Sequence, residues 1–203
     1  MKKGIFKAKT NVESQKKLYI FLIGLAILSL IFGIIFIFLV SDSNLEMIYT
    51  NISCYFNDIK SLKNTDILIN SLYNNLIYIG VLWLLGMSIV GLPIIIVIFC
   101  FKFFITGFSI SSIIYTFKAK GILKMFIHLF PHQIVYLIIL LLICFYSVSF
   151  CIKLFKYLFL KKMINFKEVM SKYFKVLFIS CLVSLFVSLY ESYISLYLLN
   201  LFN

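Results

Sequence analysis

The chain of 203 residues is 63% hydrophobic and only 13% charged, and it carries a net charge of +12. Soluble domains are about half apolar and about a quarter charged, so this composition excludes an ordinary soluble domain. The sequence predicts an all-α, polytopic membrane protein that forms one integral membrane domain over residues 1–203.

The positive charge is carried by lysine alone and is clustered. Six lysines precede residue 18, and seven lie from Lys153 to Lys175. Such clusters beside apolar segments are typical of cytoplasmic loops held against anionic membrane lipid. No zinc-finger spacing, glycine-rich phosphate loop or arginine cluster accompanies them, so the charge does not indicate nucleic-acid binding. The absence of arginine beside abundant Lys, Ile, Asn, Phe and Tyr indicates an AT-rich, bacterial genome.

The first apolar segment, residues 18–40, follows a basic N-terminal stretch. It resembles a signal peptide, but it is too long and no A-x-A cleavage site follows it. We therefore expect a retained signal anchor that crosses the membrane.

The second apolar region, residues 67–117, is too long for one crossing, which needs about 20 residues. Its only charge is Lys102. If it crossed once, the lysine-rich stretch 151–175 would lie outside, against the positive-inside rule. A turn at Gly91 and Leu92, with Pro93 at the start of the next helix, gives two crossings instead.

Five spans result, near residues 18–40, 72–91, 93–117, 123–150 and 175–199. The N-terminus and residues 151–175 are then cytoplasmic, whereas residues 41–71 and the C-terminus lie outside. The outer loop carries four of the seven acidic residues: Asp42, Glu46, Asp58 and Asp66. Three lysines that fall outside speak against this arrangement: Lys118, Lys120 and Lys124.

Two of the connecting segments carry apolar residues at steps of three and four, which predicts amphipathic helices on the membrane surface. Plain apolar loops are the alternative. The outer stripe consists of Leu45, Ile48, Ile52, Tyr55, Ile59 and Leu62. The inner stripe consists of Ile152, Phe155, Phe159, Met163, Phe166 and Met170.

The chain offers no convincing catalytic, cofactor or metal motif, which favours a protein that is not an enzyme. His128 and His132 have the spacing of metal ligands on a helix, but HLFPH lacks the glutamate of a zinc-protease HExxH motif. No acidic residue lies between Asp66 and Glu168. The cysteines form no CxxC pair. They are Cys54, Cys100, Cys144, Cys151 and Cys181.

Lys102 and Glu191 each lie inside a predicted span. A charge at the bilayer centre costs roughly 2.5–3.5 kcal/mol, so such a residue usually faces protein or water. Each also belongs to a polar stripe that we expect to face the bundle interior. Two readings stay open: the charges interact, directly or through water, or Lys102 reaches the inner surface and Glu191 the outer one. The stripes are Lys102, Thr106, Ser109, Ser112 and Thr116, and Ser180, Ser184, Ser188, Glu191 and Ser195.

The middle of the chain resembles the stage II sporulation protein M family over roughly residues 75–145. The resemblance begins with WLLGMSIVGLP, from Trp83 to Pro93. It continues with Lys102, Gly107 and Phe108, then Gly121-Ile122-Leu123, then Pro131-His132-Gln133. The chain departs from the family at Phe103, where members often carry glycine. In PHQIVY, Gln133 and Tyr136 stand for the glycine and the acid of a PHGxxE-like motif.

The resemblance implies that Gly86, Gly91 and Pro93 shape the turn, and that Gly107, Gly121 and Pro131 are packing or kink positions. It also implies a non-enzymatic scaffold in the cytoplasmic membrane. The scaffold would act in endospore engulfment by localising two partners that cut peptidoglycan, stage II sporulation proteins D and P. The alternative is a permease-like transporter subunit with Lys102 and Glu191 near its substrate path. The sequence leaves open whether the chain forms a homo-oligomer.

Overall fold

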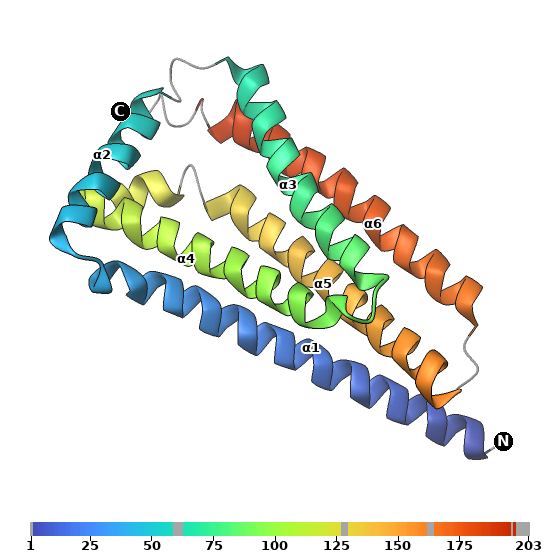
Figure 1. Ribbon diagram of the computed structural model, residues 1–203. Helices are drawn as coiled ribbons and strands as arrows, with labels where there is room; N and C mark the ends of the chain where they lie inside the picture. Colours follow the sequence, from blue (N-terminus) through green and yellow to red (C-terminus); the bar gives the residue numbers. More distant parts are fainter. Residues whose placement is uncertain (1, 59–62, 127–129, 162–164, 196, 198–203) are drawn as a thin grey trace.

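The computed structural model describes residues 2–58, 63–126, 130–161, 165–195 and 197. The elements in this part of the chain are all helical (Figure 1). They are α1 (Lys2–Phe36), η1 (Ile37–Leu39), α2 (Asp42–Asp58), α3 (Asn64–Gly86), α4 (Gly91–Lys124), α5 (Phe130–Leu160), α6 (Phe166–Leu189) and η3 (Tyr190–Ser195).

Five helical segments are long and apolar enough to cross a membrane, which confirms the predicted number. They are Glu13–Leu39, Asn64–Gly86, Gly91–Leu123, Phe130–Leu160 and Phe166–Ser195. Because hydrocarbon offers no partners for backbone N–H and C=O groups, helices satisfy these groups internally. The all-α class follows directly from that constraint.

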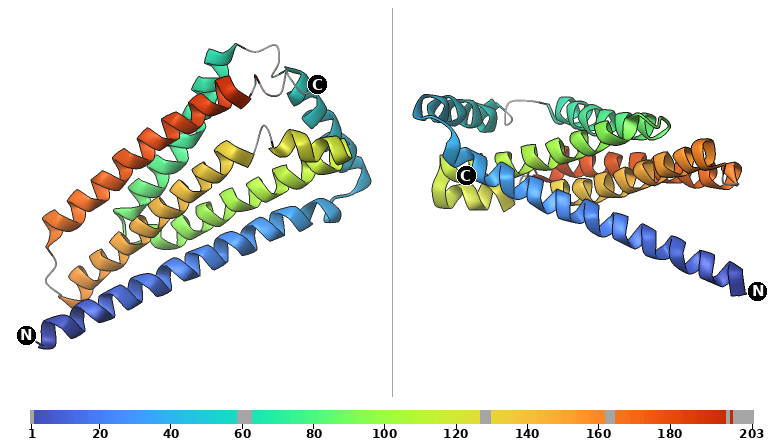
Figure 2. Two further views of the ribbon diagram at one scale, coloured as in Figure 1. Left: turned by 180° about the vertical axis from the view of Figure 1, so that it is seen from behind. Right: turned by 60° about the horizontal axis from the view of Figure 1, so that its bottom comes forward.

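The spans form an antiparallel bundle with two distinct ends (Figure 1). The start of α1, the α3–α4 turn, the end of α5 and the start of α6 lie at one end, which we call the lysine-rich end. The other, which we call the α2 end, holds α2, the last part of α4, the start of α5 and η3. Figure 2 shows α1 and α3 on opposite sides of the layer that contains α4 and α5. Successive spans therefore alternate in direction, as the five-span prediction requires.

α1 packs closely along α4 because glycines lie where the two helices touch. A Cβ atom on Gly33 would lie 2.1 Å from the carbonyl oxygen of Phe104, and one on Gly107 would lie 2.2 Å from that of Leu30. No real Cβ contact is so short, so any side chain here would force the helices apart. Small residues bring spans together in this way because packing, rather than the hydrophobic effect, holds helices together in lipid.

The chain reverses direction between α3 and α4, within the long apolar region of residues 67–117. Residues 87–90 form the turn, just before the predicted Gly91 and Leu92. A Cβ atom on Gly91 would lie 2.0 Å from the carbonyl oxygen of Leu85, so the turn is as tight as a glycine allows. Pro93 lies in the first turn of α4, where backbone N–H groups have no partner within the helix.

α4 does not lead directly into the next span, which corrects the predicted boundary at residue 123. Lys118 adopts a positive φ of 51°, which is uncommon outside glycine, and the helix bends there. After the bend the chain folds back so closely that a Cβ atom on Gly121 would lie 2.5 Å from the carbonyl oxygen of Ile113. α5 begins only at Phe130, with Pro131 in its first turn. His128 lies outside the described residues.

The outer amphipathic stripe forms α2, as predicted. Ile52 of this helix packs against Ile113 of α4, so the stripe faces the bundle. The stripe's last two members, Ile59 and Leu62, lie outside the described residues.

The inner amphipathic stripe is helical, but it does not form a separate surface helix as expected. Residues 152–160 extend α5, and α6 begins at Phe166, where the Asn165 side chain accepts a hydrogen bond from the Glu168 backbone N–H at 3.4 Å. The longer spans leave no room for another element between them. Met163 lies outside the described residues.

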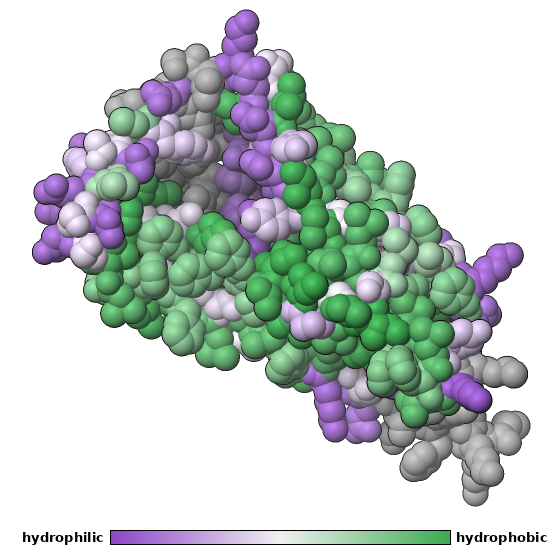
Figure 3. Space-filling view, in the orientation of Figure 1, coloured by the Kyte–Doolittle hydropathy of each residue, from purple (hydrophilic) through white to green (hydrophobic). Residues whose placement is uncertain are grey.

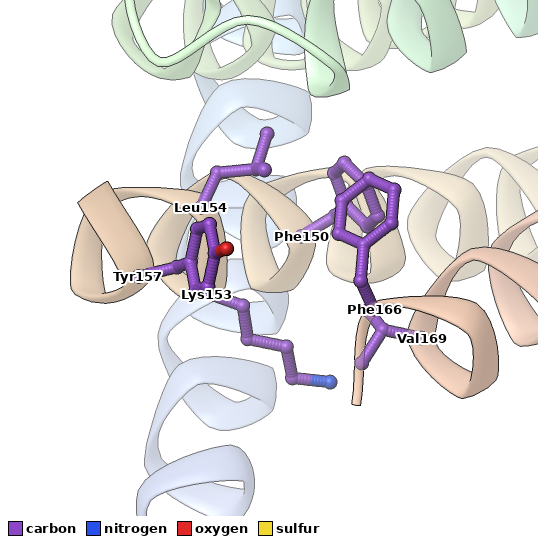
Figure 4. Close-up of a pocket in the computed structure, with 6 residues that line it drawn as sticks. All are labelled: Phe150, Lys153, Leu154, Tyr157, Phe166 and Val169. Carbon is purple, nitrogen blue, oxygen red and sulfur yellow. The ribbon is translucent and has the colours of Figure 1, made fainter. Parts of the chain in front are cut away.

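A small pocket lies where the end of α5 meets the start of α6. Figure 4 shows the aromatic rings of Phe150 and Phe166 on one side of it and the Tyr157 side chain on the other. Its volume of about 10 Å³ has room for about one water molecule, so we assign it no ligand.

Candidate functional site

Polar side chains from separate spans meet around Glu191 near the α2 end of the bundle. The Ser71 hydroxyl of α3 donates a hydrogen bond to Oε2 of Glu191. The His132 Nε2 atom of α5 lies 3.8 Å from the same oxygen. The Ser188 hydroxyl lies 3.1 Å from that of Ser71, and the Asn75 side-chain amide donates to Ser188 at 3.4 Å. The Glu191 carboxylate is thus contacted by polar groups of two helices, α3 and α5.

Glu191 and its neighbours occupy an unusual backbone segment. η3, from Tyr190 to Ser195, is a π-helical turn that continues α6. Such turns are rare, cluster at functional sites and change which side chains a helix presents to its neighbours. Glu191 is well covered, since 19% of its side chain is exposed, against 6% for His132.

Lys102 lies apart from Glu191, and its charge is held by aromatic rings. The ammonium lies 4.4 Å from the ring centroid of Tyr78 and 5.4 Å from that of Tyr136. Each such contact stabilises a cation by about 0.5–2 kcal/mol, most where water is excluded. Among the described residues no ion pair joins Lys102 to Glu191, so a direct bond between them is not found.

The two charges nevertheless belong to one connected polar system. The Tyr136 hydroxyl donates to the backbone carbonyl of Asn75 at 3.3 Å, and the Asn75 side chain contacts the serines beside Glu191. Tyr136 therefore links the two charged residues through its ring face on one side and its hydroxyl on the other.

A cavity of about 430 Å³ opens beside Glu191, between α2 and the bundle. In Figure 3, hydrophilic side chains line a hollow near the α2 end, next to a strongly hydrophobic body. The Gln133 side-chain amide on its wall donates to Thr106 at 3.1 Å. The cavity is lined by Ile48, Asn51, Ile52, Tyr55, Phe108, Ser109, Ser112, Ile113, His132, Gln133 and Glu191.

The two polar stripes face the bundle interior, as predicted. Lys102 and Ser109 are half-buried, Thr106, Ser112 and Thr116 are buried, and so are the four serines of the second stripe. The small serines allow the helices to approach closely, while Ser188 and Glu191 supply the polar contacts described above.

A second cluster holds the α3–α4 turn in place near the lysine-rich end. The Tyr173 hydroxyl donates to the backbone carbonyl of Trp83 at 2.7 Å and lies 2.8 Å from the Ser147 hydroxyl. The rings of Trp83 and Tyr173 stack at 5.5 Å, and a Cβ atom on Gly86 would lie 2.0 Å from the Tyr173 oxygen. The Cys151 thiol donates to the Gly86 carbonyl at 3.2 Å. This cluster is structural, because its hydroxyls and its thiol bond to one another or to the backbone of α3.

The structure thus separates the residues that the sequence singled out. His132 and Glu191 lie close together, whereas Lys102 is connected to their network through the ring of Tyr136. Gly86, Gly91 and Pro93 lie beside the α3–α4 turn. Gly107 lies where α4 touches α1, Gly121 lies after the bend in α4, and Pro131 lies in the first turn of α5. Among the described residues no group of three histidine, cysteine or acidic side chains is arranged to hold a metal ion.

Sequence reasoning missed the α3 side of the site. Ser71 and Asn75 are four residues apart and Tyr78 follows one turn later, so all three share a helix face. The same search for polar stripes that found Lys102 and Glu191 would have found them. Ser71 escaped it because it lies just before the predicted span of residues 72–91.

Comparison with known proteins gives one result. A family model described as Stage II sporulation protein M matches residues 20–196, which include nearly all of the five spans. No curated protein and no solved structure gives a significant match to the chain.

Proposed function

The chain belongs to the stage II sporulation protein M family, and from this we propose that it is a non-enzymatic scaffold of the sporulation engulfment complex. In this role it localises peptidoglycan-degrading partners, stage II sporulation proteins D and P, at the septal and engulfing membrane. The observation that carries the proposal is the match over residues 20–196, because it extends through the whole bundle rather than one motif.

The shape of the chain is compatible with this role. Its described residues form a membrane bundle whose spans are joined by short connections, with α2 as the one helix that does not span. A partner that cuts peptidoglycan works outside the cytoplasmic membrane. It would therefore meet the scaffold at the outer end of the bundle or along the outer half of the spans.

We propose that the lysine-rich end is cytoplasmic and the α2 end lies outside. Among the described residues, six lysines at the start of α1 and six from Lys153 to Lys175 belong to the former end, whereas α2 carries Asp42, Glu46 and Asp58. Lysine near the ends of spans is retained on the cytoplasmic side, and acidic residues contribute little to orientation.

This orientation predicts a labelling pattern. In a variant without native cysteines, we expect a membrane-impermeant thiol reagent to label Met47→Cys in intact cells but not Lys167→Cys. Both side chains are exposed in the structure, so access across the membrane alone distinguishes them. Both positions should react once the cells are permeabilised. Labelling of position 167 but not 47 in intact cells would refute the orientation.

The scaffold role predicts specific partners. We expect the tagged protein, purified from sporulating cells in mild detergent, to bring down proteins D and P, while an unrelated tagged multi-pass protein does not. With a photo-crosslinking residue at position 47 the partners should be captured, because they work outside. At position 167 they should not. Recovery of neither protein from sporulating cells would contradict the proposal.

A permease-like transporter subunit is the second candidate, and the cavity beside Glu191 is the observation that favours it. Transport sites are commonly built between spans and contain ionisable side chains. Lys102, however, does not line this cavity in the structure. A neighbouring ATPase gene would favour the transporter, and expression tied to sporulation would favour the scaffold.

A further inference from the structure

We propose that the cavity under α2 binds a small molecule that carries a primary ammonium group on an apolar body, with Glu191 as the partner of the ammonium. This binding site goes beyond the scaffold role and does not depend on it.

The cavity wall carries the negative charge of Glu191, which favours a positively charged ligand. Glu191 lines the cavity, where its carboxylate accepts a hydrogen bond from the Ser71 hydroxyl and lies 3.8 Å from the His132 Nε2 atom. Within the described part of the chain no lysine nitrogen lies within 4 Å of this carboxylate, and no lysine lines the cavity. A covered carboxylate is costly when no lysine contacts it, as holds among the described residues, and a bound ammonium would supply an opposite charge at contact distance.

A second observation also points to an occupant. The Ser112 side chain lines the cavity and is only 2% exposed. Its hydroxyl has no hydrogen-bond partner among the described residues. A buried hydroxyl left in this state costs about 1–3 kcal/mol, so a group in the cavity that bonds to it is favoured. Asn51 and Gln133 add side-chain amides to the same wall.

The remaining side chains of the cavity wall are mostly apolar, so the part of the ligand that they contact should be apolar too. These apolar side chains include Ile48 and Ile52 of α2 and Phe108 and Ile113 of α4. The cavity volume of about 430 Å³ lies in the range of small-molecule sites, roughly 300–1,000 Å³. An apolar body with one ammonium matches this division of the wall. A free amine and an aminophospholipid headgroup are two sources of this chemistry.

The test uses the intact protein in detergent and two probes of the same shape, cyclohexylamine and cyclohexanol. We expect the amine to raise the thermal unfolding midpoint in a saturable way and the alcohol to have little effect. Glu191→Gln should weaken amine binding about tenfold or more, because a charge-assisted bond is lost. Equal effects of amine and alcohol, or unchanged affinity in Glu191→Gln, would overturn the proposal.

A second pair of variants leaves Glu191 in place, in case Glu191→Gln does not fold. Ile48→Trp fills the cavity from α2 and should abolish the effect of the amine. Met47→Trp is its matched control, because Met47 is 61% exposed and does not line the cavity. If Ile48→Trp and Met47→Trp bind cyclohexylamine equally well, the amine does not occupy this cavity and the proposal fails.

The same thermal unfolding measurement, made with the protein in nanodiscs, distinguishes a free amine from an aminophospholipid headgroup as the natural ligand. Weaker cyclohexylamine binding in phosphatidylethanolamine than in phosphatidylcholine, which is also zwitterionic but has no primary ammonium, assigns the site to a lipid headgroup, and equal binding assigns it to a free amine. Recovery of the partner proteins is scored separately, so failure of the amine site leaves the scaffold proposal standing, and the reverse also holds.

Discussion

Gly33→Ala is expected to destabilise the protein by about 3 kcal/mol, the upper part of the range for overpacking of a well-packed contact. The added Cβ atom would lie 2.1 Å from the Phe104 carbonyl oxygen and 2.9 Å from the Phe108 nitrogen. Both are backbone atoms, which cannot swing aside as a side chain can, so α1 must move away from α4. The measurement is the thermal unfolding midpoint of the purified protein in detergent.

Gly24→Ala is the matched control for this change. Gly24 lies in the same helix, and a Cβ atom there would have nothing within 4 Å. Alanine is the better helix former by about 1 kcal/mol, so Gly24→Ala should leave the midpoint unchanged or raise it. Gly107→Ala should behave like Gly33→Ala, because its Cβ atom would meet the Leu30 backbone. If all three variants unfold at the same temperature, the close α1–α4 contact is not present.

The number of spans could be predicted for two reasons. The bilayer sets the length of a spanning helix, and lysine-rich loops stay on the cytoplasmic side. One region of apolar sequence had to be divided, and Gly91 and Pro93 marked where. The boundary near residue 123 could not be predicted in the same way. Ile122 and Leu123 read as the start of a span, but the bend at Lys118 places them in the last part of α4. A positive φ at a lysine has no signature in the sequence.

The candidate site could be predicted only in part. Lys102 and Glu191 stand out because isolated charges in apolar spans need a partner. Which partner each finds depends on the tilt of the spans and on the π-helical turn at Tyr190–Ser195, and neither follows from residue spacing. At about 1.5 Å per residue along straight helices, Lys102 and Glu191 lie at depths in the membrane that differ by roughly 10 Å. The structure bridges that gap with Tyr136 and α3.

The interior charges give the other large expected effect. Lys102→Glu should sharply reduce the amount of folded protein in the membrane, by an effect of about 3 kcal/mol, the scale of a misplaced charge in a span. The new carboxylate would face the rings of Tyr78 and Tyr136, whose faces attract cations and repel anions. It would also feel the like charge of Glu191. The measurement is accumulation of the tagged protein in the membrane fraction.

The exchange variant isolates the part of this effect that comes from Glu191. Lys102→Met keeps most of the side chain and removes the charge, so it should cost less than Lys102→Glu. Glu191→Lys alone places a second cation in the network. Combined with Lys102→Glu, it should restore some of the lost protein, because the two charges again have opposite signs. Recovery should be incomplete, since the rings still face a carboxylate.

A double variant no better than the worse single would show that Lys102 and Glu191 do not interact. If Lys102→Glu accumulates as well as Lys102→Met, the aromatic contacts of Lys102 contribute nothing.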